Sequence, residues 1–158
     1  MFKLLPTLVF SLLIGFLCAQ QSAGVFVLLA ILFLVPWLAY SAYLIWRKPL
    51  VRISQLLKIC IWCVVFTGVF ATHEYYRIKS REAANVVASA ITSYRSKNGE
   101  FPVRLTDAGV QLPKHGGQWR LYYAFGSKEP SLSYPSTFDP FDSYTYDFAG
   151  SKWAFYPD

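Results

Sequence analysis

Hydrophobic and polar positions divide the chain near residue 72. Between Leu4 and Trp46 there is no Asp, Glu, Lys or Arg, and the only polar stretch is Gln20–Gly24. A membrane span needs about 20 apolar residues, and burying a charge in hydrocarbon is costly. The pattern therefore predicts two membrane spans, at about residues 4–20 and 24–46, joined by a tight turn. A third apolar segment at residues 53–72 has Lys58 as its only charge.

After residue 72 the apolar positions follow a helical period. They recur every three or four residues, at Ala83, Val86, Val87, Ala90, Ile91 and Tyr94, which predicts one apolar stripe on a helix. No Pro or Gly lies between Gly68 and Gly99, so the third span is expected to continue into this helix without a break. Asn98-Gly99 supplies a left-handed stop, and Pro102 prevents the helix from resuming.

The rest of the chain predicts strands. Segments that contain aromatic residues and are bounded by turn residues lie at about 118–125, 131–134, 144–148 and 152–156. Ala149-Gly150-Ser151 separates the last two segments, which is a hairpin signal. We therefore expect an α+β membrane protein. Its membrane domain at 1–72 has three transmembrane helices, and the third continues into a domain at 73–158, where the helix packs on an antiparallel sheet of three or four strands.

The charges indicate an orientation and argue against a nucleic-acid partner. Residues 1–72 contain five basic residues and no acidic one, whereas residues 73–158 contain ten basic and nine acidic residues. A nucleic-acid binder would concentrate basic residues on its soluble domain. The segment 47–52 contains three basic residues, so the positive-inside rule predicts a cytoplasmic loop and N-terminus, with the C-terminal domain outside. Cleavage of the first segment as a signal peptide is an alternative that leaves this domain on the same side.

Catalytic and metal chemistry have weak signals. Cys60 and Cys63 have the C-x-x-C spacing of redox motifs, but cysteines within a span also act as small hydrophobes. Neither His73 nor His115 lies in a catalytic or metal-binding motif, and no nucleophile, phosphate-loop or zinc-ligand motif is present. Calcium needs six to eight oxygens at one place, and the candidate acids, Asp139, Asp142 and Asp147, are scattered. We expect neither an enzyme nor a cofactor.

Two motifs in residues 73–158 carry a resemblance. The first is Tyr94-Arg-Ser-Lys-Asn-Gly-Glu-Phe-Pro102, at the end of the predicted helix, and the second is Asp139-Pro140-Phe141, followed by Tyr144 and Tyr146. In this order they resemble the periplasmic domains of type IV pilins and of the major pseudopilins of type II secretion. The resemblance implies a long helix packed on a sheet.

The first 72 residues depart from the pilin pattern. Pilins begin with a short basic leader, a Gly cleavage site and Phe-Thr-Leu-Ile-Glu, and this chain has no such string. Three spans below a pilin-like domain resemble the type IV pilin accessory proteins. That resemblance implies an inner-membrane chaperone, with a periplasmic C-terminal domain, that binds a cognate type IV pilin and promotes its stability or assembly. Its partners would be the pilin, the bilayer and the pilus assembly machinery. The alternative is a structural component of a type IV pilus or type II secretion platform.

Candidate partner-binding residues follow from these expectations. Small residues in the third span, Thr67, Gly68 and Ala71, allow close approach of another helix. Lys58 could pair with the acidic residue near the start of a pilin helix, or its side chain could simply reach the cytoplasmic headgroups. Aromatic residues that alternate along strands could form the core or a binding face. The candidate set also includes four aromatic residues, Tyr75, Tyr76, Trp119 and Tyr123.

Overall fold

The structure, a computed structural model, describes residues 4–111, 121–126, 130–139 and 141–157. Within it the chain divides into two compact units, Met1–Glu74 and Tyr75–Asp158. The helix α3, Arg52–Asn98, runs through the boundary as one element of 47 residues. This confirms the prediction that the third apolar segment continues into the following helix without a break.

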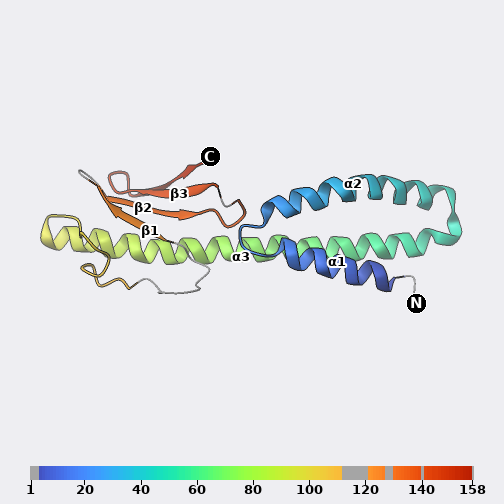
Figure 1. Ribbon diagram of the computed structural model, residues 1–158, viewed down its shortest axis with the longest axis horizontal. Helices are drawn as coiled ribbons and strands as arrows, with labels where there is room; N and C mark the ends of the chain where they lie inside the picture. Colours follow the sequence, from blue (N-terminus) through green and yellow to red (C-terminus); the bar gives the residue numbers. More distant parts are fainter. Residues whose placement is uncertain (1–3, 112–120, 127–129, 140, 158) are drawn as a thin grey trace. The chain divides into compact units, whose positions relative to one another are not determined.

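The first unit is helical. It contains α1 (Leu5–Cys18), α2 (Gly24–Arg47), the short 3₁₀ helix η1 (Pro49–Val51) and the beginning of α3 (Figure 1). Of the described helices, two are long and apolar enough to cross a membrane. One is α2, and the other is α3 together with the short helix η1 that precedes it. The predicted first span is shorter than expected, because α1 has 14 residues and at 1.5 Å per residue extends only about 21 Å.

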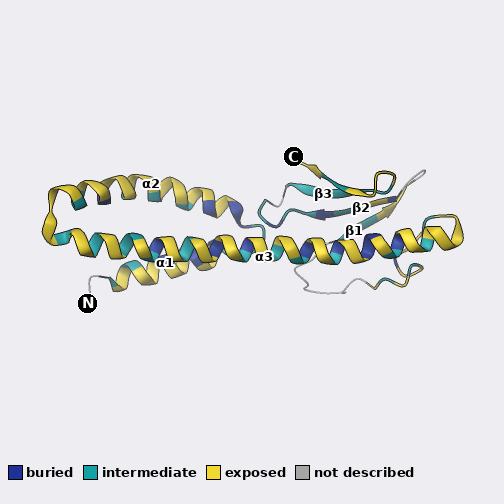
Figure 2. Ribbon diagram, turned by 180° about the vertical axis from the view of Figure 1, so that it is seen from behind, coloured by how far each residue is buried: buried dark blue, intermediate teal, exposed yellow. Residues whose placement is uncertain are grey.

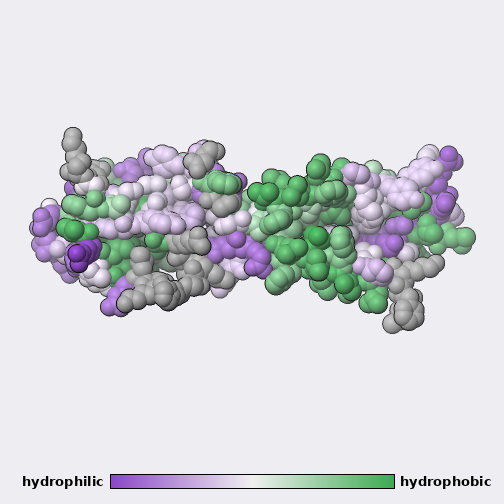
Figure 3. Space-filling model, viewed as in Figure 1, coloured by the Kyte–Doolittle hydropathy of each residue, from purple (hydrophilic) through white to green (hydrophobic). Residues whose placement is uncertain are grey.

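Spacing explains how the first unit is built. The less exposed positions of α2 recur every seven residues at Val27, Leu34 and Ser41, and those of α3 recur at Gln55, Trp62 and Val69. A seven-residue repeat of inward positions is typical of helices that pack lengthwise. Most other positions of these helices are exposed (Figure 2), and many of them carry large apolar side chains. These helices therefore form a strongly hydrophobic surface (Figure 3).

Three contacts hold α1 against α3. The rings of Phe10 and Trp62 meet edge to face at 6.2 Å. A Cβ on Gly15 would lie 2.5 Å from Cγ1 of Val65, so only glycine allows the two helices to approach so closely. At the end of α1, Nε2 of the buried His73 lies 2.8 Å from the Cys18 carbonyl. His73 thus satisfies one of the carbonyls that a helix end leaves without an intrahelical partner.

The second unit contains the rest of α3 and one sheet. Gly99 adopts a left-handed φ of 78° directly after the helix, as the Asn98-Gly99 motif predicts. The strands are β1 (Tyr122–Phe125), β2 (Pro130–Pro135), β3 (Ser143–Asp147) and β4 (Lys152–Tyr156). They are antiparallel in the order β1-β2-β3-β4. The α+β class, the long helix and the final hairpin are therefore confirmed, and the sheet has four strands.

The core lies between α3 and the sheet. It consists of Val87, Ala88 and Ile91 from α3, Leu105 from the segment after the helix, and Leu132 from β2. The predicted apolar stripe is wrong at Val86, which is 69% exposed. Within the second unit, the buried positions of α3 are Ser80, Ala84, Val87, Ala88 and Ile91. The small residues Ser80, Ala84 and Ala88 make this face of α3 flatter. The sheet packs on this face and leaves the adjoining face, which contains Val86, exposed.

The sheet register separates the aromatic side chains by face. Trp153 donates its indole N–H to Oδ1 of Asn85 at 2.8 Å, so its face of β4 is directed toward α3. Side chains alternate along a strand, and the register puts most described strand aromatics on that same face: Tyr123, Phe125, Tyr134, Tyr144, Tyr146, Trp153 and Phe155. Apart from Tyr122 and Tyr156, the opposite face consists of mainly small or polar residues. An aromatic binding face on the outside of the sheet is therefore not present in the described strands.

Alkaline pH should destabilise this aromatic core. Burial raises the pKa of Tyr134, because a phenolate is disfavoured away from water, although Arg81 acts to lower it. Above the ordinary tyrosine pKa of about 10 the unfolded chain loses this proton first, so stability is lost as pH rises further. As the pH rises above this value, we expect the melting temperature of the full chain to fall less in Tyr134→Phe than in the parent protein. Near-ultraviolet circular dichroism measures the melting temperature. An equal fall in both proteins would contradict this assignment.

Candidate partner-binding surfaces

One side of α3 is open along the apolar half of the helix. Val64, Gly68, Ala71 and Tyr75 recur at spacings of four, three and four, and all are exposed. Residues with this spacing share one face of a helix. Two of the predicted small residues, Gly68 and Ala71, therefore lie together with Tyr75. Thr67 lies beside this stripe, and its hydroxyl donates to the Cys63 carbonyl at 2.8 Å, so its polarity is satisfied within the helix.

Gly15 and Gly68, which both lie in helices of the first unit, differ in their surroundings. Gly15 lies against Val65 and is needed for packing within the chain, whereas a Cβ on Gly68 would meet nothing within 4 Å. Glycine in a helix interior is unfavourable by about 1 kcal/mol relative to alanine. Nothing in the described part of the chain uses the space at Gly68. This side of α3 is therefore uncovered at Gly68 within the described residues.

Lys58 and Tyr76 lie on the other side of α3. Both are half-buried and share the inward face of the helix with Trp62 and Val69. Lys58 is separated from Thr67 by nine residues, which is two and a half turns of an α-helix, so the two side chains leave opposite faces. The candidate set thus separates into an open group (Thr67, Gly68, Ala71 and Tyr75) and an inward pair (Lys58 and Tyr76).

The aromatic candidates of the second unit have different positions. The hydroxyl of Tyr123 donates to the Pro102 carbonyl and its ring packs against the core. Burial raises the pKa of this phenol, and Asp107 adds to the effect. Tyr123 therefore fastens the segment after α3 to β1, a role that alternation along a strand does not reveal. Trp119 lies outside the described residues.

Two of the three acids considered as calcium ligands stabilise turns. Oδ1 of Asp147 accepts backbone N–H groups from Ala149 and Gly150, both at 3.0 Å, and Oδ1 of Asp139 accepts that of Phe141 at 3.0 Å. Within the described ranges, no three His, Cys, Asp or Glu side chains group where they could hold a metal ion. Cys60 and Cys63 are free and exposed, and Cys18 is free and buried.

A shallow hollow of about 540 Å³ borders the edge strand β1. It is lined by Val103, Arg104 and Leu105 on one side and by residues of β1 and β2 on the other, including Tyr122 and Ser133. The described lining contains no carboxylate, His or Cys. It therefore lacks the groups from which a nucleophile with its base, or a metal centre, is usually built.

No protein-family model, curated protein or solved structure matches this chain.

Proposed function

We propose that this chain is an inner-membrane accessory protein that binds a cognate type IV pilin and promotes its stability or its assembly into pili. One observation carries the proposal. The helix α3 is apolar and open on one side in its first half, and in its second half it becomes the core helix of an α+β unit. The protein thus combines a membrane segment with space for another helix and a domain that ends its helix with the pilin-like Asn98-Gly99-Glu-Phe-Pro motif.

The proposed membrane arrangement follows the charges. The helices α2 and α3 cross the bilayer, and α1 lies in it as a third, shorter apolar helix. The connection between α2 and α3 contains Arg47, Lys48 and Arg52 and lies in the cytoplasm together with the N-terminus, as the positive-inside rule predicts. Residues 75–158 then lie in the periplasm, where the head of a membrane-embedded pilin is also found.

The client helix would dock on the stripe of Val64, Gly68 and Ala71. In a bilayer the association of helices gains little from the hydrophobic effect, because lipid tails are as apolar as the side chains. Close backbone approach at small residues, which increases van der Waals contact, provides the attraction instead. Gly68 permits such an approach and makes no close contact in its own chain. The proposed function is therefore binding.

Lys58 gives a separate prediction. Because its side chain is on the inward face of α3, we expect Lys58→Ala to leave co-purification of the pilin unchanged within about twofold, the scale of a few tenths of a kcal/mol. In that case the Lys58 ammonium extends to the lipid headgroups on the cytoplasmic side and does not contact the pilin. A loss of pilin binding at normal protein level would instead support the ion pair between Lys58 and the acidic residue of the pilin helix.

Removal of the gene tests the proposed function. We expect the level and the surface assembly of one pilin to fall, while a second pilin in the same cell still assembles. The wild-type gene supplied in trans should restore the affected pilin. If every pilin fails to assemble while all remain at normal levels, the protein is a component of the assembly platform and the accessory proposal is wrong.

A further inference from the structure

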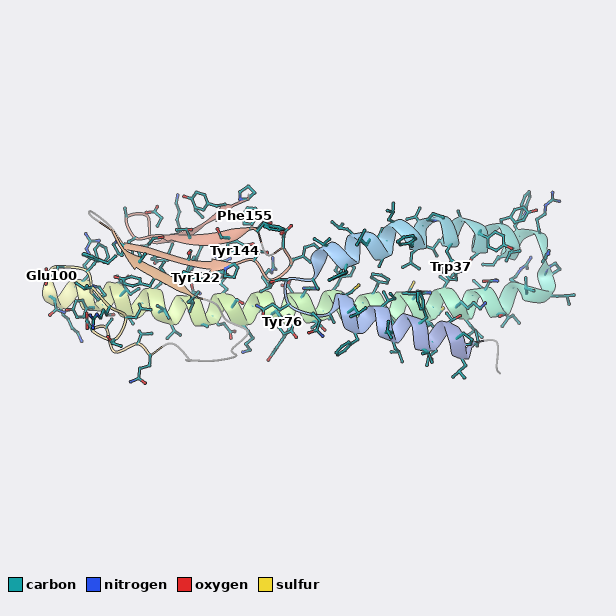
Figure 4. The ribbon with its side chains drawn as sticks, viewed as in Figure 1. Trp37, Tyr76, Glu100, Tyr122, Tyr144 and Phe155 are labelled. Atoms are coloured by element: carbon teal, nitrogen blue, oxygen red, sulfur yellow. The ribbon has the colours of Figure 1, made fainter. Side chains whose placement is uncertain are left out.

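The sheet of the second unit has two edges that differ in their residues. Its order, β1-β2-β3-β4, leaves β1 and β4 each with one side that pairs with no strand of the described chain. At the edge of β4, Lys152 begins the strand and Pro157 follows it, and both types of residue discourage pairing with another strand. The edge strand β1, where Tyr122 lies (Figure 4), contains no charged residue and no proline. Its own side chains therefore leave its free edge open to an added strand.

Apolar side chains are exposed on both faces of β1. Side chains alternate along a strand, so Tyr122 and Phe125 point to opposite faces of the sheet, and both are more than half exposed. Val103, which lines the hollow beside β1, is also exposed. A strand added to β1 would place its own side chains next to these and remove their apolar surface from water.

The segment after α3 holds a cation next to this edge. Leu105 is buried in the core, and the Tyr123 hydroxyl donates to the Pro102 carbonyl. These contacts fix the backbone on both sides of Arg104 near β1. The backbone N–H of Arg104 donates to Oδ2 of Asp107 at 3.0 Å, which closes a turn. The guanidinium of Arg104 forms no hydrogen bond or ion pair with a described residue. Since Arg104 is the charged residue in the described lining of the hollow, the hollow favours a negatively charged ligand.

We propose that the free edge of β1 binds an extended peptide segment of a partner protein by strand addition, and that Arg104 pairs with a carboxylate of this segment. Main-chain hydrogen bonds to an edge strand give such complexes their affinity, and pockets beside the strand give them specificity. An arginine guanidinium binds a carboxylate through two parallel N–H groups. Because the backbone around Arg104 is already fixed, less binding free energy is lost in ordering it. All of these residues belong to the second unit, so the site is independent of the pilin helix proposed to bind α3.

A library of random hexapeptides with free C-terminal carboxylates tests the strand addition on the full chain in nanodiscs. The peptides that bind most strongly are synthesised again in two N-methylated forms, one methylated at odd positions and the other at even positions. Successive N–H groups of an extended peptide point to opposite sides, so only one of the two forms loses its hydrogen bonds to β1. We expect that form to bind about tenfold more weakly or worse, and the other to bind nearly as well as the unmodified peptide. Fluorescence anisotropy measures the binding, and empty nanodiscs give the background.

Charge reversal at Arg104 tests the contact with the carboxylate. Arg104→Glu replaces attraction by repulsion, so we expect it to weaken binding of the selected peptides by about tenfold. Arg104→Gln, which removes only the charge, should have a smaller effect in the same direction. Lys152→Glu is the matched control, because it makes the same change of charge at the edge of β4, and it should change the affinity by less than about twofold. Near-ultraviolet circular dichroism verifies that each variant keeps the fold of the parent.

The peptides selected by the parent protein should contain an acidic residue or require their free C-terminal carboxylate. Any of three results would overturn the proposal. The first is that no peptide binds above the level of empty nanodiscs. The second is that both N-methylated forms bind alike, because the hollow would then hold a carboxylate without strand addition. The third is that Arg104→Glu and Lys152→Glu have equal effects.

Discussion

Replacing Ile91 by alanine is expected to lower the free energy of unfolding of the second unit by about 3 kcal/mol. Ile91 has no exposed surface and packs with Val87, Leu105 and Leu132 between α3 and the sheet. Removing three methyl or methylene groups there loses burial and leaves a cavity, because the aromatic side chains around it relax only partly. Guanidinium unfolding of the full chain in detergent micelles, followed by near-ultraviolet circular dichroism, measures the change.

Val86→Ala is the matched control for this substitution. Val86 is also a β-branched residue of α3, but its side chain faces solvent. A surface substitution of this kind changes the unfolding free energy by no more than about 0.5 kcal/mol. Similar losses at both positions would mean that the core is not where α3 meets the sheet.

Gly68→Leu is expected to reduce recovery of the cognate pilin with this protein by about tenfold or more, which corresponds to about 1.4 kcal/mol of binding free energy. A Cβ added at this position would meet nothing within 4 Å, so a side chain can leave the backbone here without a clash. A leucine side chain would, however, hold a docking helix away from the backbone of α3, so close contact along Val64, Gly68 and Ala71 would be lost. Co-purification from detergent-solubilised membranes measures the effect.

Gly15→Leu distinguishes partner binding from folding. Its side chain would overlap Val65, so this variant should disturb the packing of α1 on α3 and lower the amount of protein in the membrane. Gly68→Leu should accumulate normally and be at least as stable as the parent, since leucine is a better helix former than glycine. Normal pilin recovery with Gly68→Leu would show that the stripe is not the docking surface.

Local signals were sufficient to predict most of the fold. The uninterrupted run from Gly68 to Gly99 predicted the continuity of α3, and Ala149-Gly150-Ser151 predicted the last hairpin. Both depend on turn and helix-stop chemistry among neighbouring residues. The predicted apolar stripe wrongly included Val86, because the sequence has apolar residues on two adjoining faces of this helix. Only the sheet, which is distant in the sequence, decides which face is buried.

The candidate site was predicted less completely. Small residues at 67, 68 and 71 were recognised from their types, but that pattern does not reveal whether another helix of the same chain already covers them. The separation of Lys58 from Gly68 depends on which side of α3 packs inward, which also depends on α1 and α2. The hydroxyl of Tyr123 bonds to Pro102, a partner 21 positions away, so its internal role required three-dimensional information.

Photo-crosslinking in living cells tests the pilin-binding claim most directly. A photoreactive amino acid is placed at Val64, which is 73% exposed on the open stripe, and at Phe33, which is 76% exposed on α2. Both positions face the surroundings of the chain, but only Val64 borders Gly68. We expect a crosslink from Val64 to unassembled pilin and little or none from Phe33. Crosslinks from Val64 only to components of the assembly machinery, with the pilin absent, would contradict it.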